Sequence, residues 1–201
     1  MYLFGAKGHG KVVAEILEKN NIIINAFIDT DPNMNEIFGY KILQQVPEET
    51  INMIISIGDN LKRKKIVFEN RMLNYGIAIH PYASISKRAK INDGTVIMSG
   101  VTINSEVLVG SHCIINTNAS IDHECTIGDF VHISPNAAVA GNVEIGEGTH
   151  IGIGSCIIQG IKIGKWCTIG AGAVVIKDIP DGSTVVGNPG RILKINDVSQ
   201  L

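Results

Sequence analysis

Three ionisable side chains in a row, Asp122, His123 and Glu124, lie within the stretch ASIDHECTIGDFVHIS at residues 119–134. Histidine can take up a proton near neutral pH, and a neighbouring carboxylate can orient its ring and stabilise the cation that forms. The run is therefore a candidate general base with an orienting partner. The alternative is a solvated polar corner without a catalytic role. For a histidine on its own, this alternative would be the better interpretation.

Two further histidines, His132 and His150, are separated by eighteen residues. Histidines in register could suggest a metal ion, but a zinc site takes three or more protein ligands. No third ligand at a suitable spacing is evident among His80, His112 and His123. We therefore expect no metal.

A glycine-rich turn gives a second kind of candidate site. In FGAKGHGKVVAE, Gly5, Gly8 and Gly10 follow an expected strand and open an expected helix, so backbone N–H groups could approach a phosphate. Asp29 ends the next strand about twenty residues on, where an acid can hold a ribose hydroxyl, and SIGDN at 56–60 ends another strand at the same edge. A nucleotide site is favoured over a tight turn without a ligand. The spacing is not the dinucleotide G-x-G-x-x-G, which argues against a nicotinamide dehydrogenase.

The N-terminal part of the chain alternates short apolar strands with helices. Strands are expected at 2–6, 23–29, 39–43 and 53–58, and helices at 8–20 and 60–73. This order predicts a small parallel sheet in a Rossmann-like α/β domain over residues 1–76.

A repeat occupies the remainder. From Ile79 to Val175 every sixth residue is isoleucine or valine, at seventeen positions without a miss. The residue four places later is small or compact, with Ile161 as the exception, and the residue directly after is often glycine. A branched residue pointing in, a small residue at a corner and a permissive glycine describe a triangular coil with six residues to a side. Residues 77–201 are therefore predicted to form a parallel β-helix of five to six coils, about 25 Å tall, with VVGNPGRILK as a C-terminal cap.

The repeat decides where the candidate residues point. His123 follows the inward Ile121 by two places and should face out near a corner, whereas His132 and His150 share one column. His123 and His132 are nine residues apart, which is half a coil. A site that uses both would lie between subunits.

Composition and cysteine usage narrow the functional classes. Hydrophobic residues make up 45% of the 201 residues, enough for a core, and a net charge of -2 argues against nucleic acid or an anionic membrane as partner. The N-terminus lacks a signal-peptide pattern, and no apolar run approaches the roughly 20 residues of a membrane helix. The cysteines form no CxxC pair, and Cys113, Cys125 and Cys167 share the small slot of the repeat, so we expect structural thiols in a cytoplasmic protein.

Four stretches resemble the bacterial acetyltransferases that act on UDP-4-amino sugars, hexapeptide-repeat enzymes related to the sialic-acid O-acetyltransferases. They are GAKGHGKVVAE, ISIGDNLKRKKI, INTNASIDHECTIGDFVHISPNAAVAGNVEIG and VVGNPGRILK. The resemblance covers nearly the whole chain, and the combination is specific, although the glycine loop alone is not. It implies a left-handed β-helix, where the general crossover rule would favour a right-handed one. It also implies a homotrimer that binds acetyl-CoA in the groove between two prisms and the UDP part on the N-terminal domain.

The same resemblance implies roles for individual residues. Catalysis would use His123 as general base and Glu124 as its orienting partner, with Asp122 beside it and Asn116 positioning the substrate or the base. The UDP-amino-sugar would be held by Lys7, Gly8, His9, Asp29 and Gly58. Acetyl-CoA would contact His132 and the backbone near Gly141, Ile153 and Ala171. Asp122 is shorter than the glutamate often found at its position, and Lys7 replaces a small residue.

The predicted reaction is transfer of acetyl from acetyl-CoA to the 4-amino group of a UDP-linked amino-deoxy sugar, for the synthesis of a surface glycan or a glycoprotein glycan. One rival is a sialic-acid-type O-acetyltransferase, which would use the same base on a hydroxyl acceptor. Another is a non-enzymatic nucleotide-sugar-binding trimer, which would bind UDP without coenzyme A. A β-helix metalloenzyme is the third.

Overall fold

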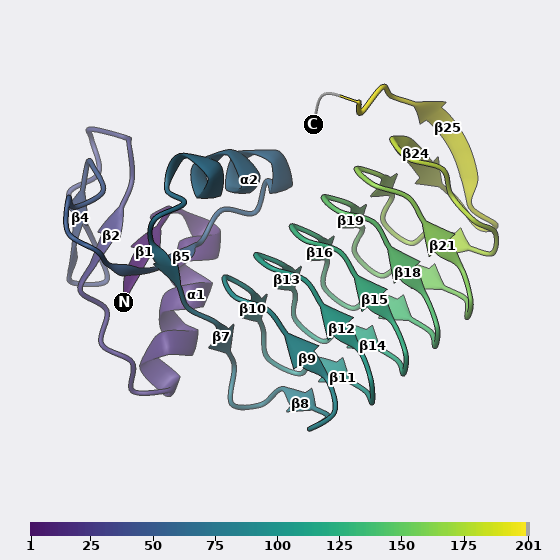
Figure 1. The fold of residues 1–201 in the computed structure, drawn as a ribbon, viewed down its shortest axis with the longest axis horizontal. Coiled ribbons are helices and arrows are strands. Elements are labelled where there is room, and N and C mark those ends of the chain that lie inside the picture. The colour runs from purple at the N-terminus through teal and green to yellow at the C-terminus, as the bar shows by residue number, and fades with distance from the viewer. Residues whose placement is uncertain (200–201) are drawn as a thin grey trace.

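Two parts of different architecture make up the computed structural model, which describes residues 1–199 (Figure 1). The N-terminal part is a six-stranded sheet in the order β3-β4-β2-β1-β5-β6, parallel except for the β3–β4 hairpin. Its strands are β1 (Tyr2–Phe4), β2 (Ala26–Ile28), β3 (Glu36–Ile37), β4 (Tyr40–Leu43), β5 (Asn52–Ile55) and β6 (Asn74–Tyr75), and its helices are α1 (Gly8–Lys19) and α2 (Asn60–Glu69). The predicted small parallel sheet is confirmed.

Two local features of this part differ from the sequence expectation. The β3–β4 hairpin turns through Phe38 (φ 52°) and Gly39 (φ 79°). The first position of such a turn usually carries asparagine or aspartate, so the phenylalanine gave no turn signal in the sequence. Helix α2 ends at Glu69 rather than at residue 73. The side-chain amide of Asn70 donates to the carbonyl of Ile66 and so replaces the helical hydrogen bond.

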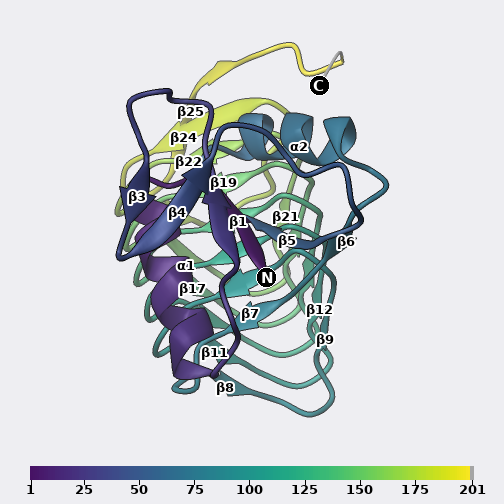
Figure 2. The same ribbon diagram turned by 90° about the vertical axis from the view of Figure 1, so that its left-hand side faces the viewer.

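Helix α1 joins the two parts through a shared core. Val13 and Leu17 are fully buried, but Val12, which the sequence pattern places on the same side, is 39% exposed. The buried side of α1 packs in one cluster with Phe27 of the sheet and Val96 of the coils. Figure 2 looks onto the N-terminal part, which lies in front of the coils. The sheet is therefore held against the first coils of the stack.

The coils present three faces, each a parallel sheet of two-residue strands. The first face holds β7 (Ala78–Ile79), β10 (Val96–Ile97), β13 (Ile114–Ile115), β16 (His132–Ile133), β19 (His150–Ile151) and β22 (Thr168–Ile169). The second face holds β8 (Ser84–Ile85), β11 (Thr102–Ile103), β14 (Ser120–Ile121), β17 (Ala138–Val139), β20 (Cys156–Ile157) and β23 (Val174–Val175). The third face holds β9 (Lys90–Ile91), β12 (Leu108–Val109), β15 (Thr126–Ile127), β18 (Glu144–Ile145) and β21 (Lys162–Ile163).

The register confirms the eighteen-residue coil. Each strand residue pairs with the residue eighteen places on, as Ile121 does with Val139. The turns between the faces form three corners, named here first–second, second–third and third–first. Residues that differ by eighteen therefore stack in a column along one face or one corner.

The interior of the prism is filled by two sets of residues from the repeat. The branched beat residues point inward, and so do the small residues four places later, including Cys113, Cys125 and Cys167. This burial confirms that packing explains those three thiols, whereas Cys156 is exposed on the second face. At the open end of the stack the first beat, Ile79, is 36% exposed.

The glycines directly after the beats do not supply conformational freedom, contrary to the sequence expectation. In the turns that follow the beats from Ile91 to Ile169, the left-handed residue lies three places after the beat, as at Asn118 (φ 56°) and Asn142 (φ 55°). Gly128, one place after a beat, has no positive φ, but a Cβ there would lie 2.7 Å from the nitrogen of Glu147. Those glycines are needed because successive coils approach closely at the corners.

A hairpin ends the described chain. Strand β24 (Ser183–Val186) extends the first face beyond β22, and β25 (Arg191–Ile195) folds back antiparallel to it. The hairpin lies at the end of the stack away from the N-terminal sheet (Figure 1). Within residues 1–199, neither helix has the length and apolarity to cross a membrane.

Candidate active site

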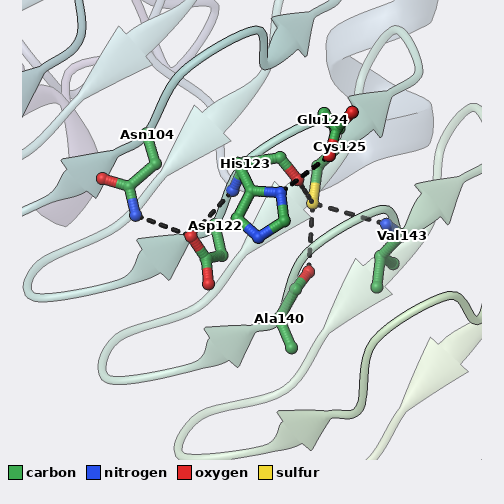
Figure 3. Close-up of polar contacts among 7 residues, drawn as sticks. All are labelled: Asn104, Asp122, His123, Glu124, Cys125, Ala140 and Val143. Carbon is green, nitrogen blue, oxygen red and sulfur yellow. Dashed lines mark hydrogen bonds and ion pairs between the residues drawn. The ribbon is translucent and has the colours of Figure 1, made fainter.

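His123 lies in the turn after β14, at the second–third corner, and is paired with its sequence neighbour (Figure 3). Its Nδ1 is 2.9 Å from the Oε2 of Glu124, and both side chains are more than half exposed. Because a carboxylate only accepts hydrogen bonds, Nδ1 carries the hydrogen, and Nε2 is left with a lone pair. This contact is the geometry that a general base with an orienting carboxylate requires, and the catalytic role of the pair stays a prediction.

Asp122 holds the backbone of this turn rather than the imidazole. Its Oδ1 accepts hydrogen bonds from the backbone N–H of His123 (2.8 Å) and from the Nδ2 of Asn104 (2.7 Å). The hydrogen bond from Asn104, followed by that from the His123 backbone, lowers the pKa of the Asp122 carboxyl. Asn104 is a site residue that sequence reasoning missed, although its position eighteen residues before Asp122 is a usable signal.

The ring of His123 rests on Gly141, which lies eighteen residues further along the same corner. A Cβ at Gly141 would lie 2.6 Å from the ring carbon Cε1 and 2.7 Å from Nε2. The N–H of Gly141 donates to no backbone carbonyl within residues 1–199. The next coil thus offers the ring an open backbone surface with a donor beside it.

The thiol of Cys125 lies beneath this turn and serves packing. Its Sγ is 3.1 Å from the carbonyl oxygen of Ala140 and accepts from the N–H of Val143 at 3.5 Å (Figure 3). Burial raises the pKa of the Cys125 thiol. A buried, protonated thiol is a poor nucleophile.

Asn116 and His132 form a second polar group on the first face. The Oδ1 of Asn116 accepts from the N–H of Thr117 (2.8 Å), so its Nδ2 donates to the Nε2 of His132 (3.1 Å). His132 is therefore neutral with its hydrogen on Nδ1. Burial, followed by the charge of His150, lowers the pKa of His132 to about 3.

His150 lies directly over His132, one coil on. The two rings stack at 4.9 Å and 4° between their planes, and the Nε2 of His150 is 2.7 Å from the Oγ of Ser134. Burial lowers the pKa of His150 as well. In the part of the chain that the structure describes, no group of three or more His, Cys, Asp and Glu side chains could hold a metal ion.

Four of the five residues predicted to hold the nucleotide surround one cavity. The cavity, about 420 Å³, lies where β1, β2 and β5 end, and its lining includes Lys7, His9, Asp29 and Gly58. Gly8 does not line it but begins α1 beside it. An adjoining cavity of about 310 Å³ runs under α2 and adds Phe4, Ile66 and Lys65.

Backbone donors fix the acid of this pocket. Two of its lining residues were not among the predicted site residues, although SIGDN and ISIGDNLKRKKI contain them. Asp29 accepts from the N–H of Ala6 through Oδ2 (2.9 Å) and from that of Asp31 through Oδ1 (3.1 Å). Ser56 is buried and donates to the Gly5 carbonyl (2.8 Å), while Lys62 reaches both cavities from the first turn of α2. A nucleotide here would meet the N-terminus of α1 and a lysine.

The predicted residues for acetyl-CoA and catalysis fall on two different corners of one chain. His123 and Gly141 stack at the second–third corner, whereas Ile153 and Ala171 stack at the first–second corner. Asn116 contacts His132, not His123. The structure thus brings the predicted residues together in two groups separated by the width of the second face.

Comparison with known proteins gives matches over both parts of the chain. Residues 1–69 match the family model of the PglD N-terminal domain, and residues 142–177 match that of the bacterial transferase hexapeptide (six repeats). No curated protein sequence matches the chain.

Several solved structures are similar over nearly the full length. A mutant perosamine N-acetyltransferase from Caulobacter crescentus, in complex with CoA and GDP-perosamine, is 32% identical, with 96% of each chain covered and a TM-score of 0.90. The acetyltransferase domain of PglB from Neisseria gonorrhoeae, in complex with acetyl coenzyme A, is 36% identical, with 96% of this chain and 98% of that chain covered and a TM-score of 0.89. WeeI from Acinetobacter baumannii is 29% identical over the same shares, with a TM-score of 0.88.

Proposed function

Because this chain belongs to the family of hexapeptide-repeat sugar N-acetyltransferases with a PglD-type N-terminal domain, we propose that it acetylates the 4-amino group of a UDP-linked amino-deoxy sugar with acetyl-CoA. Membership of the family establishes a CoA-dependent sugar N-acetyltransferase. The observation that carries the rest is that one chain presents both a nucleotide-sized cavity at the strand ends and an exposed His–Glu pair.

His123 is the general base of the proposed reaction. The sugar amine forms a bond to the acetyl carbonyl carbon while the Nε2 of His123 takes a proton from the nitrogen. The carbon–sulfur bond then breaks, and the imidazolium returns the proton to the departing thiolate. Glu124, 2.9 Å from Nδ1, stabilises the imidazolium. We assign the oxyanion to the N–H of Gly141, because it lies next to the His123 ring and donates to no backbone carbonyl within residues 1–199.

The active site lies between subunits of a homotrimer in this proposal. One subunit supplies the second–third corner with His123 and Gly141, and its neighbour supplies Asn116, His132 and the nucleotide cavity. The separation of these two groups on one chain supports this arrangement. Acetyl-CoA lies in the groove between the prisms, where Ile153 and Ala171 of the first–second corner face it.

The charges around the nucleotide cavity support a nucleoside diphosphate as the group that is bound there. Lys7 and Lys62 offer positive charge near the α1 N-terminus, and Asp29 lies where a ribose hydroxyl is held in related folds. One relative was solved with GDP-perosamine. We propose UDP because the glycine loop and the ISIGDNLKRKKI stretch resemble those of the UDP-sugar enzymes.

A thiol-release assay tests the proposal. Acetyl-CoA is incubated with UDP- and GDP-linked 4-amino sugars, with matched 4-hydroxy sugars as the O-acetylation arm, and free CoA is measured. Release with the UDP-4-amino sugar, and acetyl on its nitrogen by mass spectrometry, is the expected result. Faster turnover of a GDP sugar would overturn the base assignment. Turnover of the hydroxy sugars alone would establish an O-acetyltransferase.

A further inference from the structure

Arg63 of α2 is the largest fully buried side chain and lies between the two parts of the molecule. Its Nε donates to the His112 carbonyl (2.8 Å), and its Nη1 donates to the carbonyls of Ile57 (2.9 Å) and Gly58 (3.3 Å). Its Nη2 donates to the Oδ1 of Asn60 (2.8 Å) and the Phe130 carbonyl (2.8 Å). All five N–H groups of the guanidinium therefore have an acceptor, and none of these acceptors is a carboxylate.

The acceptors come from two distinct places. Ile57 and Gly58 form the wall of the nucleotide cavity after β5. His112 and Phe130 are eighteen residues apart and stack at the third–first corner, with their rings parallel at 5.3 Å. One guanidinium thus ties the nucleotide cavity to two successive coils.

The neighbours of Arg63 on α2 continue along the same corner. The Nδ2 of Asn60 donates to the Gly148 carbonyl (3.0 Å), one coil beyond Phe130. Lys64 pairs with Glu147 (2.7 Å) and lies 5.0 Å from the ring of Trp166, a further coil on. The stretch NLKRK of α2 therefore contacts four coils in succession. Of Asn60, Arg63 and Lys64, which make these contacts, Arg63 also donates to carbonyls in the wall of the nucleotide cavity.

Burial lowers the pKa of Arg63 to about 10, which still leaves it charged at neutral pH. Removing such a cation from water costs free energy. If the residue only packed α2 against the coils, a methionine or leucine could fill the same space without that cost. The five hydrogen bonds indicate that Arg63 fixes the positions of the carbonyls of Ile57 and Gly58.

We propose that Arg63 is a positioning residue for sugar acetylation: it fixes the wall of the nucleotide cavity at a set height along the β-helix, so that a bound nucleotide delivers its sugar to the coils that carry the acetyl-transfer chemistry. The inference rests on the proposed function for its substrate and on the five hydrogen bonds for its geometry. A lysine cannot replace the arginine, because its three donors on one nitrogen cannot satisfy five acceptors in two places.

The test compares Arg63→Lys with two matched variants. Arg71→Lys makes the same change at an exposed position beyond α2. Lys64→Met removes the ion pair with Glu147 and so loosens α2 on the corner, but leaves the carbonyls of Ile57 and Gly58 bound. For each variant we would measure the melting temperature, the affinity for UDP and GDP by calorimetry, and the KM of each substrate.

In Arg63→Lys we expect the KM for the nucleotide sugar to rise about tenfold or more, the cost of hydrogen bonds to a charged group. The KM for acetyl-CoA should stay unchanged, and so should the rate with an amino sugar that lacks the nucleotide. Lys64→Met should lower the melting temperature with KM values near wild type. Two results would overturn the inference. One is that nucleotide affinity and both KM values worsen in Arg63→Lys and Lys64→Met in proportion to the fall in melting temperature. The other is wild-type kinetics in Arg63→Lys.

A failure of the proposed function would be visible separately, because wild-type protein would then neither bind a nucleoside diphosphate nor release CoA. If Arg63→Lys does not fold, Asn60→Ala takes its place. It leaves one guanidinium N–H without its acceptor and should give the same change in the KM for the nucleotide sugar at smaller amplitude. Hydrogen exchange at residues 57–58 and 112–113 gives a readout that requires no activity: both segments should exchange faster in Arg63→Lys but not in Arg71→Lys.

Discussion

At the residue scale, His123 and its hydrogen bond to Glu124 carry the proposed chemistry. In His123→Ala no side chain can accept the proton of the amine, so kcat should fall on the order of 10²-fold or more. Glu124→Gln keeps the shape of the side chain but removes the charge that stabilises the imidazolium, so kcat should fall less than in His123→Ala. Thiol release under saturating substrates measures both. Unchanged turnover in His123→Ala would refute its role.

Gly141 gives a second test at this scale, because the ring of His123 lies where its Cβ would be. A methyl group 2.6 Å from the ring forces the exposed imidazole aside rather than the rigid backbone. We expect Gly141→Ala to lower kcat at least tenfold with little change in melting temperature, since misplacing a base costs rate. Gly154→Ala serves as the control for kcat alone, because a methyl group there meets no atom within 4 Å, although its φ of 63° should cost some stability. Wild-type kcat in Gly141→Ala would contradict this placement.

Individual contacts are the level at which the sequence was least informative. The exposed His–Glu pair follows from the six-residue beat, because the beat fixes which side chains point out. Asn104 lies eighteen residues before Asp122 and could have been found with the same rule. Arg63 could not, because burial of a cation without a carboxylate partner depends on carbonyls more than forty residues away in sequence.

At the element scale, the turns of the β-helix show why a repeat predicts more than a composition does. The third residue after each beat from Ile91 to Ile169 has a left-handed φ, and most of these positions hold glycine or asparagine. Glu124, at φ 60°, is an exception within the candidate site. Glu106, His112, Phe130 and Trp166 take the same conformation at this position of the turn, so the repeat imposes it on Glu124.

This strain predicts an exchange of stability for activity. Asparagine tolerates the left-handed region better than glutamate, so Glu124→Asn should stabilise the protein by up to about 1 kcal/mol. The same change removes the orienting carboxylate and should lower kcat. Urea unfolding and the CoA-release assay would be run on one preparation. Asn142→Glu, at the same turn position one coil on, should show the reverse effect on stability. A destabilised Glu124→Asn would exclude strain at this turn.

Elements of the N-terminal part were predicted in kind, but their ends were not. The sheet and both helices follow from alternating apolar segments, yet α2 stops early because an asparagine side chain takes a helical carbonyl. The β3–β4 hairpin could not be recognised from turn-residue preferences, because Phe38 occupies a position where asparagine is usual. Side-chain competition for backbone groups is decided by local geometry that sequence patterns do not contain.

At the scale of the whole molecule, buried histidines couple folding to pH. Burial, followed by the charge of Arg63, lowers the pKa of His9 and of His112 to about 4, and His132 falls to about 3. In the unfolded chain each binds a proton below about 6.5, whereas the folded state stays neutral, so stability is lost as pH falls from about 6.5 towards 4. Each such histidine contributes a slope of up to about 1.4 kcal/mol per pH unit.

Urea unfolding at pH 7.5, 6.0 and 5.0 measures this slope. His112→Phe is the informative variant, because its ring stacks on Phe130 and its Nδ1 is buried without a partner. Phenylalanine keeps the stack and cannot titrate, so the variant should lose less stability on acidification than wild type. A slope identical to that of wild type would show that His112 binds protons equally in the folded and the unfolded protein at these pH values.

On one chain His123 lies at the second–third corner and His132 on the first face, and this separation leads to a prediction about the assembly. If one subunit supplies His123 and its neighbour supplies His132, then His123→Ala and His132→Ala should each be inactive alone but complement each other in mixed trimers. After the two are unfolded and refolded together in equal amounts, a site is intact when each residue comes from the unmutated neighbour, which is about one quarter of sites in a cyclic trimer. Recovery of about that fraction of wild-type turnover is expected. Each variant refolded alone is the control, and its inactivity shows that refolding by itself restores nothing. No recovery in a mixture shown to contain heterotrimers would refute a site shared between two subunits.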